Sequence, residues 1–224
     1  MSVFKLFVNH HKKDSFVNRI RQKRFAAQQQ HIERLLEQKE SIKILDIGGE
    51  IDFWKHMGWQ NERCTIYLLN LEDRIAVSSG DTKGFIWVQG NALNLPYQAG
   101  DFDLIFSNSV IEHVGSYQNQ ALFASEVNRV CSKYMIQTPS LWFPLEPHSL
   151  LPLFQFIPHP IRAILIMVFN INYFPKQKTY KAALETSRST LMFSKKRFQQ
   201  IFPDATIEVE TLFGIPKSYT AVKM

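Results

Sequence analysis

Residues 42–49 read Ile-Lys-Ile-Leu-Asp-Ile-Gly-Gly, and this stretch decides the fold class. The run is apolar and rich in β-branched side chains, which is typical of a strand buried on both faces of a sheet. Two glycines then allow a tight turn and a close approach of the backbone to a ligand. Asp46 places a carboxylate beside that turn. The stretch therefore predicts a buried strand that ends at a binding site.

Outward from this stretch, strand-like and helix-like segments alternate. Further strands are expected at 65–69, 85–89, 102–107, 134–138, 205–213 and 217–223, and helices at 15–39, 53–57, 117–131 and 194–202. Ser15 and Ser194 are suited to cap the first and last of these helices. The alternation predicts an α/β fold with a doubly wound, mostly parallel sheet of seven strands. The last two strands are joined too tightly for a crossover helix, so one of them should be antiparallel.

Residues 141–193 form a segment of different composition. Six of the ten prolines and only two charged side chains lie between residues 141 and 175. Proline interrupts helices, so short broken helices are expected here. The uncharged run 163–172 is much shorter than the ~20 residues that span a bilayer, and no transmembrane helix is expected.

The net charge of +6 is concentrated at the N-terminus. Residues 1–24 hold seven lysines and arginines and one acid, whereas residues 25–224 carry equal numbers of basic and acidic side chains. We expect a basic arm at 1–24 followed by a single domain at 25–224. We expect such an arm to be solvated or to contact anionic lipid. Enzymes that act on nucleic acid usually place their basic side chains around the binding groove instead. No apolar signal core follows the charges, and two distant cysteines fit a reducing cytoplasm.

Polar side chains follow three of the expected strands. Asp46 lies at the end of the first, and Asn70 and Glu72 follow the second. The segment 90–96 follows the third strand, and the fourth runs into Glu112-His113. In an open α/β sheet, ligands bind beyond the carboxyl ends of the strands at the switch point. The sequence therefore predicts one ligand site at this edge.

These motifs resemble those of the class I S-adenosylmethionine (SAM)-dependent methyltransferases, closest to the branch that acts in ubiquinone and menaquinone biosynthesis. The resemblance spans about residues 42–140 and rests on Leu-Asp-Ile-Gly at 45–48, Gly-Asn-Ala-Leu-Asn-Leu-Pro at 90–96 and the strand from Phe102 to His113. It implies strand order 3-2-1-4-5-7-6, SAM as cofactor and a substrate lid at 141–193. It also implies that the cofactor contacts are Asp46, Gly48, Gly49, Asn70, Glu72, Asn91, Ala92, Ser107 and Asn108.

Catalytic residues are harder to assign. A general base is needed only if the acceptor is a hydroxyl or a similar group. The candidates are His113, Glu112 and His148, with Glu146 close to the last in sequence, and each could equally be structural. No metal site is expected. The aromatic side chains that could line an acceptor pocket, or pack in the core, are Trp142, Phe143, Phe154 and Phe156.

Two hypotheses for the function remain open. The first is methyl transfer from SAM to a small-molecule, lipid-linked or glycan-linked acceptor by a cytoplasmic enzyme, with possible peripheral contact to the inner face of an anionic membrane. The second is a catalytically silent binding protein, because Glu50 and Asp52 replace family glycines and Asn70 and Asn91 replace family acids. A nicotinamide oxidoreductase would need Gly-x-Gly-x-x-Gly, which is absent after the first strand.

Overall fold

The computed structural model describes residues 16–59, 61–72 and 82–224. Seven strands form one sheet in the order β3-β2-β1-β4-β5-β7-β6, as the resemblance implies. β7 is antiparallel to both of its neighbours, and the other strand pairs are parallel. The strands are β1 (Ile42–Ile47), β2 (Cys64–Asn70), β3 (Phe85–Gln89), β4 (Leu104–Asn108), β5 (Tyr134–Pro139), β6 (Thr206–Leu212) and β7 (Ile215–Lys223).

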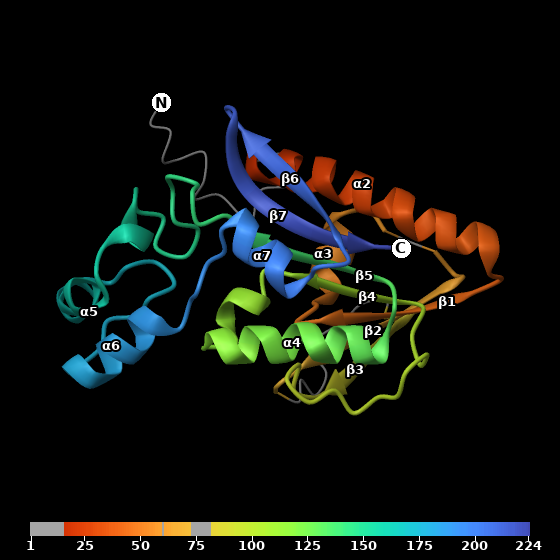
Figure 1. Cartoon of the computed structure of the whole chain (residues 1–224), viewed down its shortest axis with the longest axis horizontal. Helices are drawn as coiled ribbons and strands as arrows, with labels where there is room; N and C mark the ends of the chain where they lie inside the picture. Colours follow the sequence, from red (N-terminus) through yellow and green to blue (C-terminus); the bar gives the residue numbers. More distant parts are fainter. Residues whose placement is uncertain (1–15, 60, 73–81) are drawn as a thin grey trace.

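Helices cover both faces of the sheet (Figure 1). One face packs against helices α2 (Phe16–Gln38) and α3 (Ile51–His56) through a core that contains Phe25 and Trp54. The other packs against α4 (Tyr117–Val130) and α7 (Lys195–Ile201). β1 is buried on both faces, which explains its continuous apolar sequence. The predicted α/β fold is confirmed.

The predicted elements shift by a few residues at their ends. The short helix expected at 53–57 begins at residue 51, and the strand expected at 102–107 begins at Leu104. Ser194 caps α7 as predicted, since its hydroxyl accepts a hydrogen bond from the backbone of Arg197 at 3.3 Å. The predicted cap Ser15 and most of the expected basic arm lie outside the described residues. The rest of the arm, residues 16–24, belongs to α2.

The segment after β5 forms a small helical lid at one end of the sheet (Figure 1). It comprises the one-turn helix η2 (Phe154–Phe156), α5 (His159–Val168) and α6 (Tyr180–Arg188). Phe154, Ala163, Ile166 and Phe174 are among the side chains of its own small core. In the described part of the chain, no helix is both long and apolar enough to cross a bilayer.

Candidate active site

A cleft of about 500 Å³ opens beyond the carboxyl ends of β1, β2 and β3. We call it the cofactor cleft. Five of the nine side chains or glycines expected to contact the cofactor line it, namely Gly48, Asn70, Glu72, Asn91 and Ala92. Its size lies within the range of small-molecule sites, about 300–1,000 Å³. Leu71 and Val110 also line it, and the sequence did not single them out.

Gly48 forms the turn after β1 and lines the cleft. Its φ of +73° is in the left-handed region that favours glycine. A Cβ added at Gly48 would lie 2.4 Å from Cγ2 of Val110, and one at Gly49 would lie 2.1 Å from the Asp46 carboxylate. The two glycines are therefore required for the chain to fold over these neighbours.

Asp46 is almost fully buried under this turn. Its carboxylate accepts a hydrogen bond from the indole nitrogen of Trp54 at 2.8 Å. Burial raises the pKa of Asp46 to about 8, although the Trp54 hydrogen bond opposes the shift. The carboxyl is therefore mostly protonated at neutral pH in the absence of a cation.

A smaller cavity of about 130 Å³ adjoins the cleft at Gly48. Asp46, Gly49 and Asn108 line it, and all three were predicted cofactor contacts. Both polar atoms of the Asn108 amide are buried, and neither has a hydrogen-bond partner among the described residues. Leaving such a group unpaired costs about 1–3 kcal/mol, so this amide fits a polar ligand group in the cavity.

Two of the predicted contacts already use part of their side chains in the fold. Asn70 donates from Nδ2 to the carbonyl of Gly49 at 2.9 Å, which ties β2 to the glycine turn. Oδ1 of Asn91 accepts from the backbone of Leu93 at 2.9 Å and closes the turn after β3. Asn70 therefore offers Oδ1 to a ligand, and Asn91 offers Nδ2.

One predicted contact, Ser107, is engaged within the sheet. Ser107 is fully buried within β4, and its hydroxyl donates to the carbonyl of Ile47 at 3.0 Å. It lines neither the cofactor cleft nor the smaller cavity. Side chains alternate across a strand, so the neighbour of a ligand-facing Asn108 points to the opposite face.

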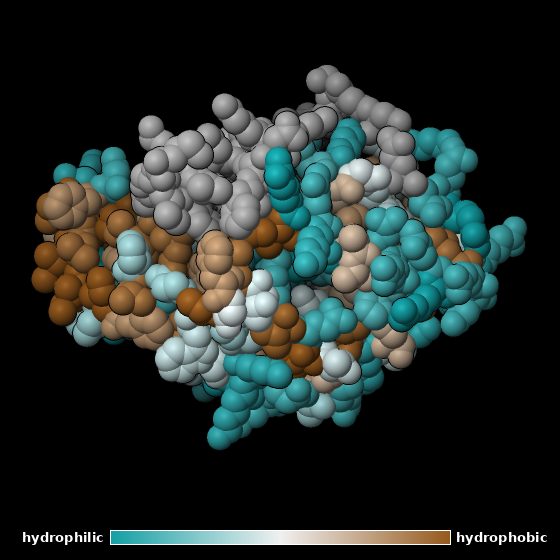
Figure 2. Space-filling view, turned by 90° about the horizontal axis from the view of Figure 1, so that it is seen from above, coloured by the Kyte–Doolittle hydropathy of each residue, from teal (hydrophilic) through white to brown (hydrophobic). Residues whose placement is uncertain are grey.

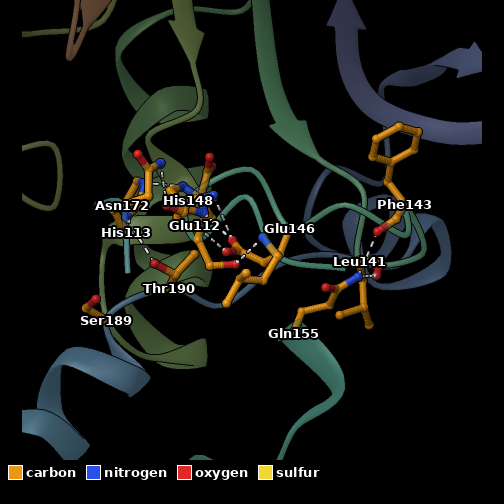
Figure 3. A network of polar contacts seen from close by, with 12 residues as sticks. Glu112, His113, Leu141, Phe143, Glu146, His148, Gln155, Asn172, Ser189 and Thr190 are labelled. Atoms are coloured by element: carbon orange, nitrogen blue, oxygen red, sulfur yellow. Dashed lines mark hydrogen bonds and ion pairs between the residues drawn. The ribbon is translucent and has the colours of Figure 1, made fainter. Parts of the chain in front are cut away.

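The three catalytic candidates come together at the end of β4 (Figure 3). His113 and Glu112 belong to the one-turn helix η1 (Ile111–His113), and His148 reaches them from the lid. Nε2 of His148 lies 3.0 Å from Nε2 of His113, and its Nδ1 lies 2.6 Å from the Glu146 carboxylate. The sequence analysis considered these residues one by one. In the structure, the segment after β5 brings His148 and Glu146 next to His113.

The electrostatics of this network follow from its burial. Glu112 is fully buried, which raises its pKa to about 7, although its Oε2 accepts from the Thr138 hydroxyl at 3.0 Å. Desolvation, followed by the nearby His148, lowers the pKa of His113 to about 4. Burial alone would raise the pKa of Glu146, but hydrogen bonds from His148 and Ser149 lower it below the usual value.

A second pocket, of about 280 Å³, lies on the other side of this network. We call it the acceptor pocket. Glu112 and His148 line it, and so do Phe143 and Tyr173. His113 lines the cofactor cleft instead, so neighbouring residues of η1 line the two pockets.

One wall of the acceptor pocket carries cations that the sequence analysis did not assign to a site. Arg21 and Arg24 come from α2, and Lys217 comes from β7. Glu210 pairs with Arg24 and with Lys217, at 3.1 Å each. Burial lowers the pKa of Arg21, and the nearby Arg24 lowers it further. Three cationic side chains line this wall, and Glu210, which pairs with two of them, is not itself a lining residue.

The aromatic candidates divide between pocket, core and surface. Phe143 lines the acceptor pocket. Phe154 is buried in the core of the lid. Trp142 and Phe156 are exposed, and their ring centroids lie 5.8 Å apart. Of the four predicted aromatic side chains, only Phe143 lies where it could contact an acceptor.

Comparison with known proteins identifies the fold. Residues 53–134 match the family described as a methyltransferase domain. The structure is similar to that of PigF with SAH, at a TM-score of 0.51 and 15% identity over 83% of this chain. It is also similar to a putative O-methyltransferase from Nostoc punctiforme PCC 73102, at a TM-score of 0.51 and 14% identity over 87% of this chain. No curated protein matches the sequence.

The matched structures are longer than this chain, which covers 57% of the first and 55% of the second. At these identities the likeness concerns the fold. The strand order and the methyltransferase-domain match over β2 to the start of β5 agree with the resemblance seen in the sequence. Residues 53–134 thus match a methyltransferase domain, and the chain has the fold of the methyltransferase structures that it resembles.

Proposed function

We propose that this chain binds SAM in the cofactor cleft and transfers its methyl group to an acceptor in the acceptor pocket. The observation that carries the proposal is that neighbouring residues of η1 line the two pockets. His113 faces the cofactor cleft and its neighbour Glu112 faces the acceptor pocket. A methyl donor in one pocket and an acceptor in the other would therefore both lie beside η1.

The lining of the cleft supports an assignment of the cofactor's parts. The cavity at Asp46 and Asn108 offers a carboxyl and an unpaired amide for the ammonium and carboxylate of the methionine end. Asn70 and Glu72 suit the ribose hydroxyls, and Asn91 suits the adenine edge, in keeping with the family resemblance. These groups retain hydrogen-bonding capacity despite the changes from the family pattern, which argues against the silent binding protein.

The chemistry of transfer needs little from the protein. When SAM is bound, its sulfonium supplies an activated methyl group. The chain's own residues hold the acceptor in line and exclude water. For a hydroxyl acceptor, the network of Glu112, His113, His148 and Glu146 would also accept the proton.

The cationic wall supports a class of acceptor. Arg24 and Lys217 share one carboxylate, Glu210, and Arg21 lines the same wall of a pocket that has both apolar and polar side chains. A carboxylate or phosphate on the acceptor would pair with the remaining positive charge. We therefore propose an acceptor with an apolar or aromatic body and an anionic group, either a free small molecule or one linked to a lipid or glycan.

A hydroxybenzoate and the corresponding neutral phenol probe this class. The wild-type protein should bind the acid at least tenfold more tightly than the phenol, as measured by calorimetry in the presence of SAH. Lys217→Gln should reduce that preference. Equal affinity of the wild type for the two compounds would contradict an anionic acceptor.

The surface of the lid supports a location at a membrane. Ile161, Ile164 and Val168 are exposed at helical spacing along α5, and apolar side chains gather at the lid end of the molecule (Figure 2). Lys176 and Lys178 are exposed in the following loop. We propose that this surface binds peripherally to an anionic membrane at the cytoplasmic face, where a lipid-linked acceptor would be found.

Titration with SAM and with its demethylated product, SAH, tests the function itself. Calorimetry should give one site per chain for each, with dissociation constants below about 100 μM. Adenosine alone should bind more weakly because it lacks the methionine end. If calorimetry detects no binding with either SAM or SAH at about 1 mM, the proposal is contradicted.

A further inference from the structure

Three side chains of the types that bind transition metals converge beneath the lid (Figure 3). They are Glu112, His113 and His148, and one potential ligand atom from each lies within 4.8 Å of the other two. Two come from η1 at the end of β4, and the third comes from the loop after β5. We propose that they form a site for a divalent transition-metal ion. This goes beyond methyl transfer, which the cofactor alone can supply.

The two histidines already have a suitable spacing. Ligands about 2.1 Å from one ion lie about 3.0–3.4 Å apart in octahedral or tetrahedral sites. The two Nε2 atoms are 3.0 Å apart, with the rings nearly perpendicular at 89°. An ion between the rings would replace the one hydrogen bond that the pair now shares.

The carboxylate gives an independent reason to expect a ligand here. Glu112 is fully buried, and one of its oxygens accepts from Thr138. The other oxygen, Oε1, is buried with no hydrogen-bond partner among the described residues. A buried carboxylate oxygen without a partner is costly, and a cation removes that cost. We assign this oxygen as the third ligand atom because it alone of the two lacks a partner.

The groups behind the histidines orient them as ligands. Nδ1 of His148 lies 2.6 Å from the Glu146 carboxylate, so it carries the proton and leaves Nε2 unprotonated. Without an ion, His113 donates from Nε2 to His148; once an ion replaces that proton, Nδ1 of His113, which lies 3.5 Å from the Thr190 hydroxyl, can carry the ring proton instead. A carboxylate or hydroxyl that receives the second ring proton is the usual support of a histidine ligand.

The ligand set selects the kind of metal. Two imidazoles and one carboxylate suit Zn²⁺, Fe²⁺ or Co²⁺ better than Mg²⁺ or Ca²⁺, which prefer oxygen ligands. Three protein ligands leave at least one position open. Glu112 and His148 line the acceptor pocket, so that open position faces the acceptor. An acceptor oxygen could complete the coordination.

Zn²⁺ binding to tag-free protein tests the site. Calorimetry should show one Zn²⁺ per chain, and Glu112→Gln, His113→Asn and His148→Asn should each weaken binding at least tenfold. His31→Asn is the matched control, because His31 also faces a carboxylate, that of Glu208 at 3.3 Å, yet lies outside the cluster. It should bind Zn²⁺ as the wild type does. The absence of Zn²⁺ binding by the wild type, or unchanged binding by all three cluster variants, would overturn the proposal.

A second measurement does not depend on the folding of the variants. Crystals of the wild type soaked in Zn²⁺ should give an anomalous peak between the two Nε2 atoms and Oε1 of Glu112. A peak only elsewhere would overturn the site. SAH titration of the same protein separates this result from the proposed function. SAH binding can be absent while Zn²⁺ still binds, and Zn²⁺ binding can be absent while SAH still binds.

Discussion

Gly48 and Gly58 share a backbone conformation but have different surroundings. Both have φ of +73°, so any other residue strains the backbone equally at the two positions. A Cβ at Gly58 would meet nothing within 4 Å, whereas one at Gly48 would meet Val110 at 2.4 Å. Val110 lines the cofactor cleft, so a side chain at Gly48 would also disturb the ligand site.

The pair gives a controlled test of the glycine turn. Gly48→Ala and Gly58→Ala should each lower the free energy of unfolding by about 1–2 kcal/mol through the positive φ. Gly48→Ala alone should also weaken SAH binding at least tenfold, because Val110 must move into the cleft. Urea unfolding and calorimetry measure the two effects. Equal SAH affinity in both variants would contradict the assignment of the turn.

Asp46 predicts a pH dependence of stability. Its pKa is about 8 in the fold and about 4 in an unfolded chain. The folded state therefore binds the proton more tightly. The resulting stabilisation is fully present below about pH 4 and is lost as the pH rises through about 8.

Asp46→Asn removes this titration and can still accept the Trp54 hydrogen bond. Relative to the variant, the wild type without ligand should lose at least ~1 kcal/mol of unfolding free energy as the pH rises from about 5 to about 9. Urea unfolding at a series of pH values measures the difference. A difference that is constant with pH would show that the Asp46 carboxyl is ionised in the fold.

At the scale of elements, the lid is where sequence analysis was least complete. The regular strands and helices were predicted within a few residues, because each has a clear hydrophobic period. The proline-rich segment indicated broken helices but not their contacts. His113 and His148 are 35 residues apart and meet only because the loop after β5 folds back over η1.

The exposed face of α5 gives a prediction at this scale. The wild type should sediment with vesicles of phosphatidylcholine containing about a quarter phosphatidylglycerol at low salt, and high salt should release it. The double variant Ile161→Gln/Ile164→Gln should stay in the supernatant. Leu122→Gln, which removes an exposed leucine from α4, should sediment as the wild type does. Sedimentation of the double variant with wild-type yield would contradict lid docking.

At the scale of the whole molecule, the sheet places two pockets on either side of η1. The edge that holds the cofactor cleft was predictable, since the polar residues after three strands share it by topology. The cationic wall was not, because α2 and β7 contribute to it from nearly opposite ends of the sequence. The predicted contact of Ser107 stays a prediction: Ser107 lies in β4, and its hydroxyl donates to the carbonyl of Ile47 within the sheet.

The most direct test of the account is a crystal structure with SAH. We expect the methionine end in the cavity of Asp46 and Asn108, the adenine near Asn91, and the sulfur facing η1, with the acceptor pocket beyond it. That arrangement would place the methyl donor and the acceptor pocket beside the same two residues, Glu112 and His113. SAH bound outside the cofactor cleft, or with its sulfur turned away from η1, would contradict the central claim.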